Sequence, residues 1–325
     1  MNVLVRTISE PSDPPESRLL VGLIGAGIQR SASPQLHEAE ADAHDLRCLY
    51  QLIDLDELGL PPEAVGDLLA DARRMGFRGL NLTHPCKQLA LDHLDELSPM
   101  TRAIGATNTV VFDHGRAIGH NTDCTGFSRG FSLGLPDVSR ERVVLLGAGG
   151  AGTAVAHAAL DLGIRELVIA DQDHERALRL ARTLGTRFGE ERALAVETTA
   201  LEGRLASADG LIHTTPTGMA SHPGTPLPAE LLRPEMWVAD IVYMPLETQL
   251  LRDARAAGCR TLDGGAMAVF QAADSFELFT GRVPDRDRML RHFSRLLDHD
   301  GGSRAGADDG TQGQTEDGRP SLRRH

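Results

Sequence analysis

Lysine is almost absent from this chain: of the 33 basic residues, 32 are arginine and one is Lys87. Arginine keeps its proton inside a protein, whereas a buried lysine can release its proton. A codon bias explains the general excess of arginine, and chance survival of one lysine is the simplest account of Lys87. The alternative is that position 87 needs a group that transfers a proton, so Lys87 is a candidate catalytic residue.

Cysteine is also scarce, and the four cysteines form no C-x-x-C pair. This pattern is typical of free thiols in a reducing compartment and gives no zinc-ligand spacing. The net charge of -13 argues against a nucleic-acid or anionic-membrane partner, because both need clustered basic residues. The N-terminus has no signal-peptide pattern, and the early apolar run is too short to span a bilayer. We therefore expect a cytoplasmic protein, a monomer or homodimer, with no metal.

Strand-like and helix-like segments alternate in the first part of the chain. We expect strands at Leu19–Ile24, Leu49–Ile53, Phe77–Leu82 and Thr109–Phe112, with helices at Ser33–Asp45, Pro62–Met75 and Pro85–Leu97. This order predicts a parallel sheet with helical crossovers.

A second series of the same kind begins at Arg142. We expect strands at Val143–Leu146, Leu167–Ala170, Ala193–Glu197, Leu211–His213 and Val238–Val242, with helices at Ala151–Leu162, Glu175–Arg187 and Glu247–Ala257. Two last helices, Ala266–Thr280 and Arg286–Asp298, have no strand after them and are expected to pack on the first unit. Residues 1–17 are expected to be a loose arm, and residues 300–325 a disordered tail.

A glycine-rich turn joins the first strand of the second series to its helix. Val143–Leu146 runs into the G-x-G-x-x-G pattern of residues 147–152. Glycines there allow a tight turn, and the helix N-terminus faces the negative charge of a pyrophosphate. A turn with packing duties only is the alternative. We predict a dinucleotide site with contacts from Gly147, Gly149, Gly150, Ala151 and Gly152.

The cofactor choice depends on the end of the next strand. Asp171 lies 19 residues after Gly152, where an acidic residue binds the adenosine ribose of NAD. Asp173 adds a second negative charge that would repel the 2′-phosphate of NADP, although it can instead cap the following helix. Arg176 is the nearest cation and is predicted, with Asp171 and Asp173, among the cofactor contacts, although on its helix we expect it to pair with a neighbouring acid. The prediction is NAD.

Polar residues also follow the strands of the first series. Residues 31–34 follow its first strand, residues 81–87 its third, and residues 119–123 its fourth across a turn. In open α/β sheets ligands bind beyond the carboxyl ends of the strands. We therefore predict two doubly wound α/β domains. Residues 18–123, completed by helices within 265–299, form an N-terminal substrate domain, and residues 124–264 form a C-terminal Rossmann NAD-binding domain.

These segments resemble the shikimate dehydrogenase family, which has Ser-x-Ser-Pro, Asn-Val-Thr-x-Pro-x-Lys, Gly-Ala-x-Asn-Thr and Asn-Thr-Asp-Gly-x-Gly in this order. The chain has Ser31–Pro34, Asn81–Lys87, Gly105–Thr109 and Asn121–Gly126 in the same order. Further similar blocks are Thr215–Met219, Asp240–Pro245 and Gly265–Ala272. The resemblance covers about residues 19–298.

The resemblance implies reversible oxidation of shikimate to 3-dehydroshikimate with a small-molecule substrate and a dinucleotide as partners. The resemblance also implies that Ser31 and Ser33 bind the substrate carboxylate. Thr83, Asn108 and Gln271 hold ring hydroxyls, and Tyr243 also lines the substrate site. The remaining cofactor contacts that it implies are Thr215, Gly218, Met219, Val242, Gly265 and Met267.

Lys87 and Asp123 are the predicted catalytic pair. A proton must leave the alcohol as the hydride leaves, and a buried lysine can accept it while the aspartate orients both groups. A structural ion pair at the domain hinge is the alternative. Ser33, placed before Pro34, can also act as a helix N-cap.

Two departures from the family pattern bear on specificity. The biosynthetic members carry Asn-Arg-Thr where this chain has Asp171-Gln172-Asp173, which resembles the NAD-using quinate/shikimate branch. Ser33 stands where quinate-active bacterial members tend to have threonine, which favours shikimate. We predict an NAD-dependent shikimate dehydrogenase with quinate as a possible second substrate. A dedicated quinate dehydrogenase, an aminoshikimate-type relative and an inactive NAD-binding sensor stay open as alternatives.

Overall fold

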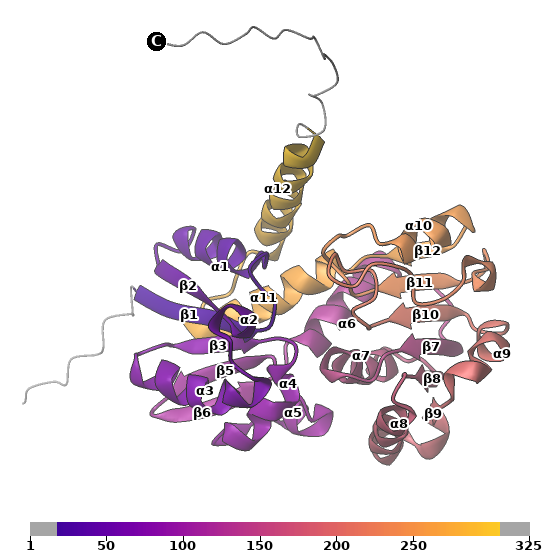
Figure 1. The fold of residues 1–325 in the computed structure, drawn as a ribbon, viewed down its shortest axis with the longest axis horizontal. Helices are drawn as coiled ribbons and strands as arrows, with labels where there is room; N and C mark the ends of the chain where they lie inside the picture. Colours follow the sequence, from indigo (N-terminus) through magenta and orange to yellow (C-terminus); the bar gives the residue numbers. More distant parts are fainter. Residues whose placement is uncertain (1–17, 306–325) are drawn as a thin grey trace, which may run out of the picture.

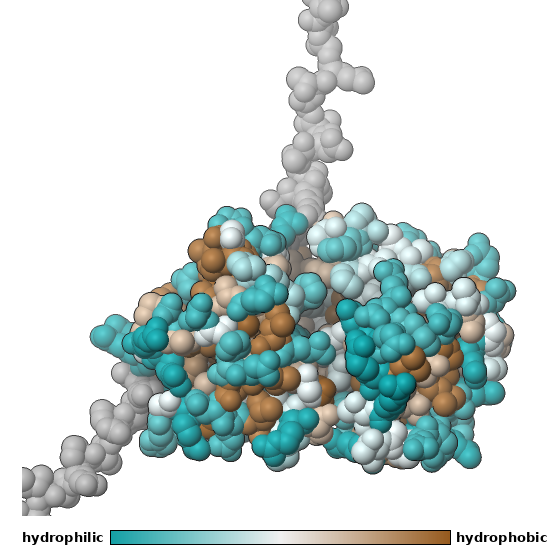
Figure 2. Space-filling view, turned by 60° about the horizontal axis from the view of Figure 1, so that its bottom comes forward, coloured by the Kyte–Doolittle hydropathy of each residue, from teal (hydrophilic) through white to brown (hydrophobic). Residues whose placement is uncertain are grey.

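The computed structural model describes residues 18–305, arranged as two lobes that lie side by side, each built on a six-stranded sheet (Figure 1). The predicted arm at 1–17 and residues 306–325 of the predicted tail lie outside the described residues. The prediction of two α/β units is confirmed. None of the described helices is long and apolar enough to cross a membrane. Apolar residues on the face drawn in Figure 2 lie in several separate patches over both lobes.

The N-terminal sheet has the strand order β2-β1-β3-β5-β6-β4. Its strands are β1 (Arg18–Gly25), β2 (Arg47–Asp54), β3 (Gly79–Leu82), β4 (Glu96–Leu97), β5 (Thr109–Asp113) and β6 (Arg116–His120). Its helices are α1 (Ser33–Asp42), α2 (Leu55–Leu58), α3 (Val65–Arg74), α4 (Cys86–Leu89) and α5 (Pro99–Ile104), with 3-10 turns at Pro62–Ala64 and Ala90–His93. Strands β1 and β3 are mostly buried, so the polar segments that follow them start from rigid elements.

Two predictions for this lobe were wrong. The sheet is mixed rather than parallel, because β5 runs antiparallel to both β3 and β6. A tight turn with positive φ at His114 and Gly115 joins β5 to β6, and so short a connection allows only a hairpin. The helix expected at Pro85–Leu97 is also shorter. It ends as α4 at Leu89, and a 3-10 turn and the short strand β4 follow.

The C-terminal sheet is entirely parallel, with the strand order β12-β11-β10-β7-β8-β9. Its strands are β7 (Arg142–Leu146), β8 (Glu166–Ala170), β9 (Ala193–Ala195), β10 (Gly210–His213), β11 (Trp237–Asp240) and β12 (Arg260–Leu262). Its helices are α7 (Gly150–Asp161), α8 (His174–Phe188), α9 (Leu201–Leu205) and α10 (Gln249–Ala256), with 3-10 turns at Glu190–Arg192, Thr198–Ala200 and Ala229–Leu231. This is the Rossmann order, and its direction reverses between β7 and β10. The short strand β12 was not predicted.

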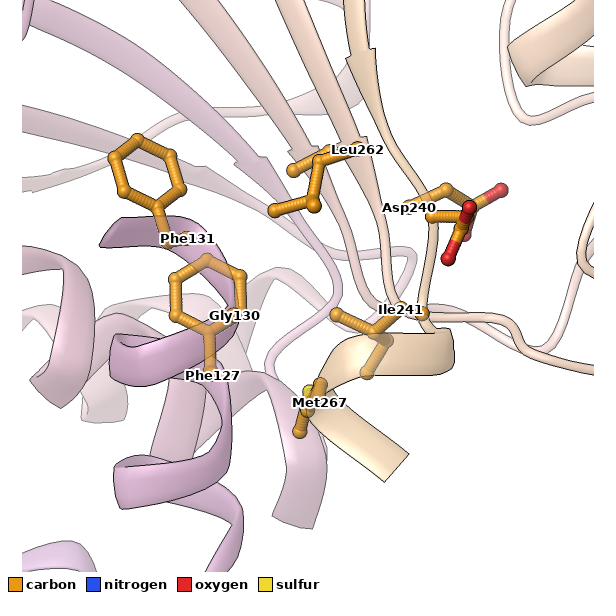
Figure 3. A pocket seen from close by; sticks show the side chains of 10 residues that line it. Phe127, Gly130, Phe131, Asp240, Ile241, Leu262 and Met267 are labelled. Carbon is orange, nitrogen blue, oxygen red and sulfur yellow. The ribbon is translucent and has the colours of Figure 1, made fainter. Parts of the chain in front are cut away.

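The chain passes between the two sheets twice, through α6 (Asp123–Gly134) and α11 (Gly265–Thr280), which lie between the lobes in Figure 1. The two helices are in close contact, since a Cβ on Gly126 would lie 2.9 Å from backbone atoms of α11. A cavity of about 10 Å³ next to them is lined by Phe127, Phe131, Leu262 and Met267 (Figure 3), which is room for about one water molecule. The last helix, α12 (Arg286–Ala305), extends past residue 298, where its predicted range ended, into the first residues of the predicted tail.

Candidate active site

Polar side chains converge at one edge of the N-terminal sheet. Thr109, the first residue of β5, pairs with Asn81 of β3 on one side and with His120 of β6 on the other. Because β5 is antiparallel, its amino end lies beside the carboxyl ends of β3 and β6. The unpredicted hairpin is therefore what brings Asn108 and Asp123 to the same edge as Lys87.

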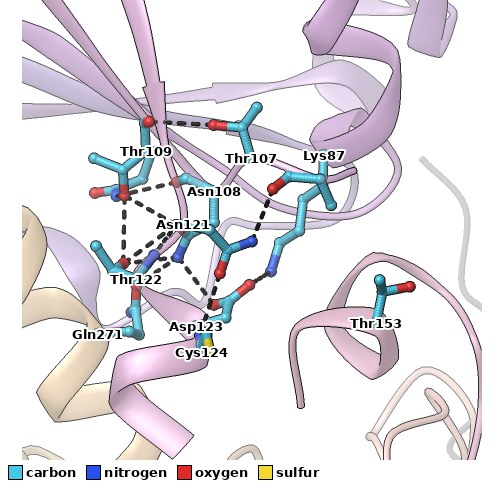
Figure 4. A network of polar contacts seen from close by, with 12 residues as sticks. Lys87, Thr107, Asn108, Thr109, Asn121, Thr122, Asp123, Cys124, Thr153 and Gln271 are labelled. Carbon is cyan, nitrogen blue, oxygen red and sulfur yellow. Dashed lines mark hydrogen bonds and ion pairs between the residues drawn. The ribbon is translucent and has the colours of Figure 1, made fainter. Parts of the chain in front are cut away.

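Lys87 and Asp123 form an ion pair at this edge. Lys87 Nζ lies 2.5 Å from Asp123 Oδ2, and the two side chains are 14% and 7% exposed. The other carboxylate oxygen, Oδ1, accepts a hydrogen bond of 2.9 Å from Asn108 Nδ2 (Figure 4). Asp123 is the first residue of α6, where the helix dipole favours a negative charge. Both oxygens of the carboxylate are thus held, and the lysine amine is fixed against one of them.

The Asn108 amide is itself fixed by a buried network that the sequence did not reveal. Its Oδ1 accepts the backbone N–H of Thr122 at 2.7 Å. Ser275 Oγ lies 3.0 Å from Asn81 Nδ2, 2.9 Å from Thr109 Oγ1 and 3.1 Å from Thr122 Oγ1. Ser275 is a fully buried serine on an otherwise apolar face of α11, and such a position is the one signal that could have indicated it.

Gln271 lies one turn before Ser275 on α11 and reaches the same site. Its Oε1 is 3.4 Å from Asn108 Nδ2, and its Nε2 donates to the carbonyl of Ala268 at 3.0 Å. The structure therefore places Gln271 with Asn108 and Asp123, as the family resemblance implied. Its contact with substrate stays a prediction.

Two serines that follow β1 lie near two tyrosines, Tyr50 of β2 and Tyr243 after β11. Ser31 Oγ donates to Ser33 Oγ at 3.1 Å and accepts the backbone N–H of Ser33 at 3.2 Å. Burial raises the pKa of Tyr243, and a hydrogen bond with Ser31 opposes the rise. Tyr50, which the sequence did not indicate, donates to Asn81 Oδ1 at 2.9 Å, and burial raises its pKa too. Four hydroxyl groups therefore gather next to the first turn of α1.

The interpretation of Ser33 as a helix cap was wrong. Helix α1 begins at Ser33 itself, its N-cap residue is Ala32, and no side chain makes the capping hydrogen bond. The Ser33 hydroxyl is engaged with Ser31 instead. Thr83 is half-buried beside the end of β1, with its methyl group where a Cβ on Gly25 would be.

The glycine turn of the second sheet faces the lysine. Gly147 has φ +102°, which a side chain would strain. A Cβ on Gly150 would lie 3.2 Å from Lys87 Cβ, so the first turn of α7 touches the stem of Lys87. Figure 4 shows Thr153 of α7 on the far side of Lys87 from the Asn108 network. The dinucleotide motif and the ion pair thus lie next to each other.

The acidic residues after β8 are turned toward the glycine turn and the next helix. Asp171 Oδ2 accepts the backbone N–H of Ala148 at 2.7 Å, and Asp173 caps α8 by accepting from Arg176 N at 3.2 Å. The Arg176 guanidinium lies 3.9 Å from Asp171 and 3.8 Å from Asp173. The predicted pairing of Arg176 is confirmed, and so is the capping alternative for Asp173.

Comparison with known proteins agrees with this arrangement. Residues 23–110 match the shikimate dehydrogenase substrate binding domain, residues 132–220 the shikimate/quinate 5-dehydrogenase family, and residues 266–292 the shikimate 5′-dehydrogenase C-terminal domain. A shikimate dehydrogenase (NADP(+)) of Streptomyces avermitilis is 61% identical over 85% of this chain and 95% of that protein. The chain belongs to the shikimate dehydrogenase family.

Two further members of the family carry NAD in their names, unlike the Streptomyces protein, whose name gives NADP(+). A quinate/shikimate dehydrogenase (NAD(+)) of Corynebacterium efficiens is 47% identical over 86% of this chain and 98% of that protein. The structure of quinate dehydrogenase from Corynebacterium glutamicum in complex with NAD superposes with a TM-score of 0.79 at 45% identity, covering 86% of this chain and 99% of that one. A nicotinamide dinucleotide as cofactor is therefore shown by the family.

The other residues that the family resemblance implied lie in loops of the second lobe and at the start of α11. Thr215 and Gly218 are half-buried in the loop after β10, and Met219 in the same loop is exposed. Val242, Gly265 and Met267 are buried, and Met267 packs against α6 in the core. Their contacts with cofactor stay predictions.

Proposed function

We propose that this protein catalyses the reversible oxidation of the ring hydroxyl of shikimate to the ketone of 3-dehydroshikimate, with NAD as cofactor and quinate as a second, poorer substrate. The observation that carries the proposal is the Lys87–Asp123 pair, which lies at a strand-end edge in contact with the glycine turn at Gly150.

The proposed reaction assigns one task to each group. Lys87 accepts the hydroxyl proton as the carbonyl forms and returns it in the reverse direction. Asp123, held by Asn108, keeps the lysine amine and the hydroxyl in line. The nicotinamide ring of the bound cofactor supplies the hydride acceptor.

The substrate is held from both ends. Ser31 and Ser33 offer their hydroxyl groups to the carboxylate, and Thr83, Asn108 and Gln271 bind ring hydroxyls. Tyr243, beside Ser31, closes the carboxylate end. For the cofactor, the backbone of residues 147–152 would hold the pyrophosphate at the start of α7.

The choice of NAD rests on charge after β8. A 2′-phosphate would add negative charge near the carboxylates of Asp171 and Asp173. The nearest guanidinium groups, Arg176 and Arg179, already lie 3.8 to 3.9 Å from those carboxylates. An acid at this point favours the free ribose hydroxyls of NAD.

The test is a set of four rate measurements on the purified protein at alkaline pH. Shikimate and quinate are each offered with NAD and with NADP, and formation of reduced cofactor is followed. Turnover of shikimate with NAD, faster than with quinate, is the expected result. Activity with NADP alone contradicts the cofactor argument, and a faster rate with quinate contradicts the reading of Ser33. No turnover in any combination contradicts the proposed reaction and favours the inactive sensor.

A further inference from the structure

A buried histidine, aspartate and threonine form a hydrogen-bonded row at the carboxyl ends of β10 and β11. His213 and Asp240 end these adjacent strands and pair in register, and neither side chain is accessible to solvent. His213 Nδ1 lies 2.9 Å from Asp240 Oδ1, and His213 Nε2 is hydrogen-bonded to the hydroxyl of Thr215. The proposed reaction gives no role to His213 or Asp240.

The donors around Asp240 fix the direction of this row. Its carboxylate accepts the backbone N–H of Val242 at 3.0 Å and the hydroxyl of Thr248 at 2.7 Å. A carboxylate only accepts, so it also takes the hydrogen of His213 Nδ1. In the neutral ring Nε2 is then the acceptor, and the Thr215 hydroxyl donates to it. The aspartate thus selects the tautomer, and the tautomer orients the threonine.

Orientation matters at Thr215 because its two branches face different neighbours. Its hydroxyl faces His213 and accepts the backbone N–H of Thr217 at 3.3 Å. Its methyl group lies 3.0 Å from the place of a Cβ on Gly147, against the glycine turn. Rotation about χ1 would move the hydroxyl away from His213 and the methyl group away from the glycine turn, and a β-branched residue has few other rotamers. His213 therefore favours the rotamer that seats the threonine against the turn.

We infer that His213 is a positioning residue that holds Thr215, and with it the loop Thr215–Met219, in the arrangement that receives the dinucleotide. This inference rests on the proposed function, because the cofactor contact of the loop is part of that proposal. The loop starts at the point where the strand order reverses, between β7 and β10. Thr214, next to Thr215, also donates to the carbonyl groups of Leu146 and Gly147, so the loop and the glycine turn are joined.

A double-mutant cycle with NADH titration tests the inference. His213→Leu and Thr215→Val are each expected to raise the NADH dissociation constant about 5- to 10-fold, as for loss of one buried hydrogen bond. The double variant should bind no more weakly than the weaker single variant, because both changes remove the same bond. His213→Gln, whose amide can still bond Thr215, should recover most of the affinity. The KM for shikimate, which binds at the other sheet, should stay unchanged in all four.

Amide hydrogen exchange of residues 215–219 without cofactor separates the inference from the proposed function. Exchange should be faster in His213→Leu and Thr215→Val than in wild type, and close to wild type in His213→Gln. Unchanged exchange, additive losses in the cycle or wild-type NADH binding by His213→Leu would each overturn the positioning role. If the wild-type protein binds no NADH, the proposed function fails. The exchange rates would then still report whether His213 orders the loop, but the loop would have no cofactor to receive.

Discussion

The edge of the N-terminal sheet carries its chemistry on side chains, whereas the edge of the C-terminal sheet carries it mainly on backbone. At the first edge the lysine, the aspartate and the Asn108 amide are all held by specific partners. At the second edge glycines keep side chains away, and the groups offered to a ligand are backbone N–H groups at the start of α7. Substitutions at the first edge should therefore act on the chemical step, and those at the second on cofactor affinity.

The largest effect is expected from Lys87→Ala. Loss of the proton acceptor should lower kcat about 10³-fold, while the NADH dissociation constant changes little. Lys87→Arg is the matched control, because it keeps a cation beside Asp123 and cannot accept the proton. Stopped-flow measurement of NADH formation reports the rate. Near-normal turnover by the arginine variant would show that the pair is only a structural ion pair.

At the second edge, Gly147→Ala should weaken NADH binding about 10-fold or more. The residue has φ +102°, and a Cβ would lie 2.8 Å from Thr214 Oγ1. Gly163→Ala is the control, because φ is +92° there and no atom lies within 4 Å of the Cβ. Gly163→Ala should lose about 1 kcal/mol of stability from its positive φ, and Gly147→Ala should lose more because of the added clash. Only Gly147→Ala should lose affinity, measured by fluorescence titration. Equal affinities would contradict the role of the turn.

A smaller change is expected from Asp171→Asn, which removes the charge and keeps an oxygen for the Ala148 N–H. The ratio of kcat/KM for NAD to that for NADP should fall about 10-fold, from loss of roughly 1.4 kcal/mol of charge repulsion. Asp173→Asn, at a more exposed cap position, should change the ratio less because solvent screens its charge. A ratio that is insensitive to both would place cofactor selection elsewhere.

The smallest expected effect is on the pH dependence of the unfolding free energy, through one buried histidine in each lobe. Burial lowers the pKa of His37 in the first lobe to about 3 and that of His157 in the second to about 4. The unfolded chain binds these protons near pH 6.5, so stability is complete above that pH and is lost as the pH falls. From pH 6.5 to 5.5 each histidine should cost about 1 kcal/mol of unfolding free energy. Urea unfolding of His37→Leu and His157→Leu should each show a shallower pH dependence than wild type, and an unchanged slope would exclude the histidine concerned.

The sequence was sufficient where the signal was local. The apolar strand Val143–Leu146 followed by glycines predicts the Rossmann turn because both the strand and the turn depend on adjacent residues. The same holds for the strand-end segment that carries Lys87. Residue type alone singled out Lys87, and the family resemblance paired it with Asp123, which it contacts in the structure.

The sequence was insufficient where distant residues decide the structure. The direction of β5 is set by its pairing with β3, which precedes it by 26 residues of intervening chain (83–108), and with β6, a strand that was not predicted. Ser33 is a local exception: it looked like a cap because it precedes Pro34, but the helix begins one residue earlier and its hydroxyl bonds Ser31 instead. Tyr50 and Ser275 lie 31 and 194 residues from Asn81, the side chain that both contact, and no local pattern links them.

The two crossings through α6 and α11 also set an order of events during synthesis. Every strand of the cofactor sheet has been translated by Leu262, so that lobe can form on the ribosome as a contiguous unit. The substrate lobe is translated first but completed last. Asn81 and Thr109 have their hydrogen-bond partner Ser275 only after more than 160 further residues have been translated. A nascent chain that stops before α11 would therefore carry its lysine and aspartate on an unfinished lobe.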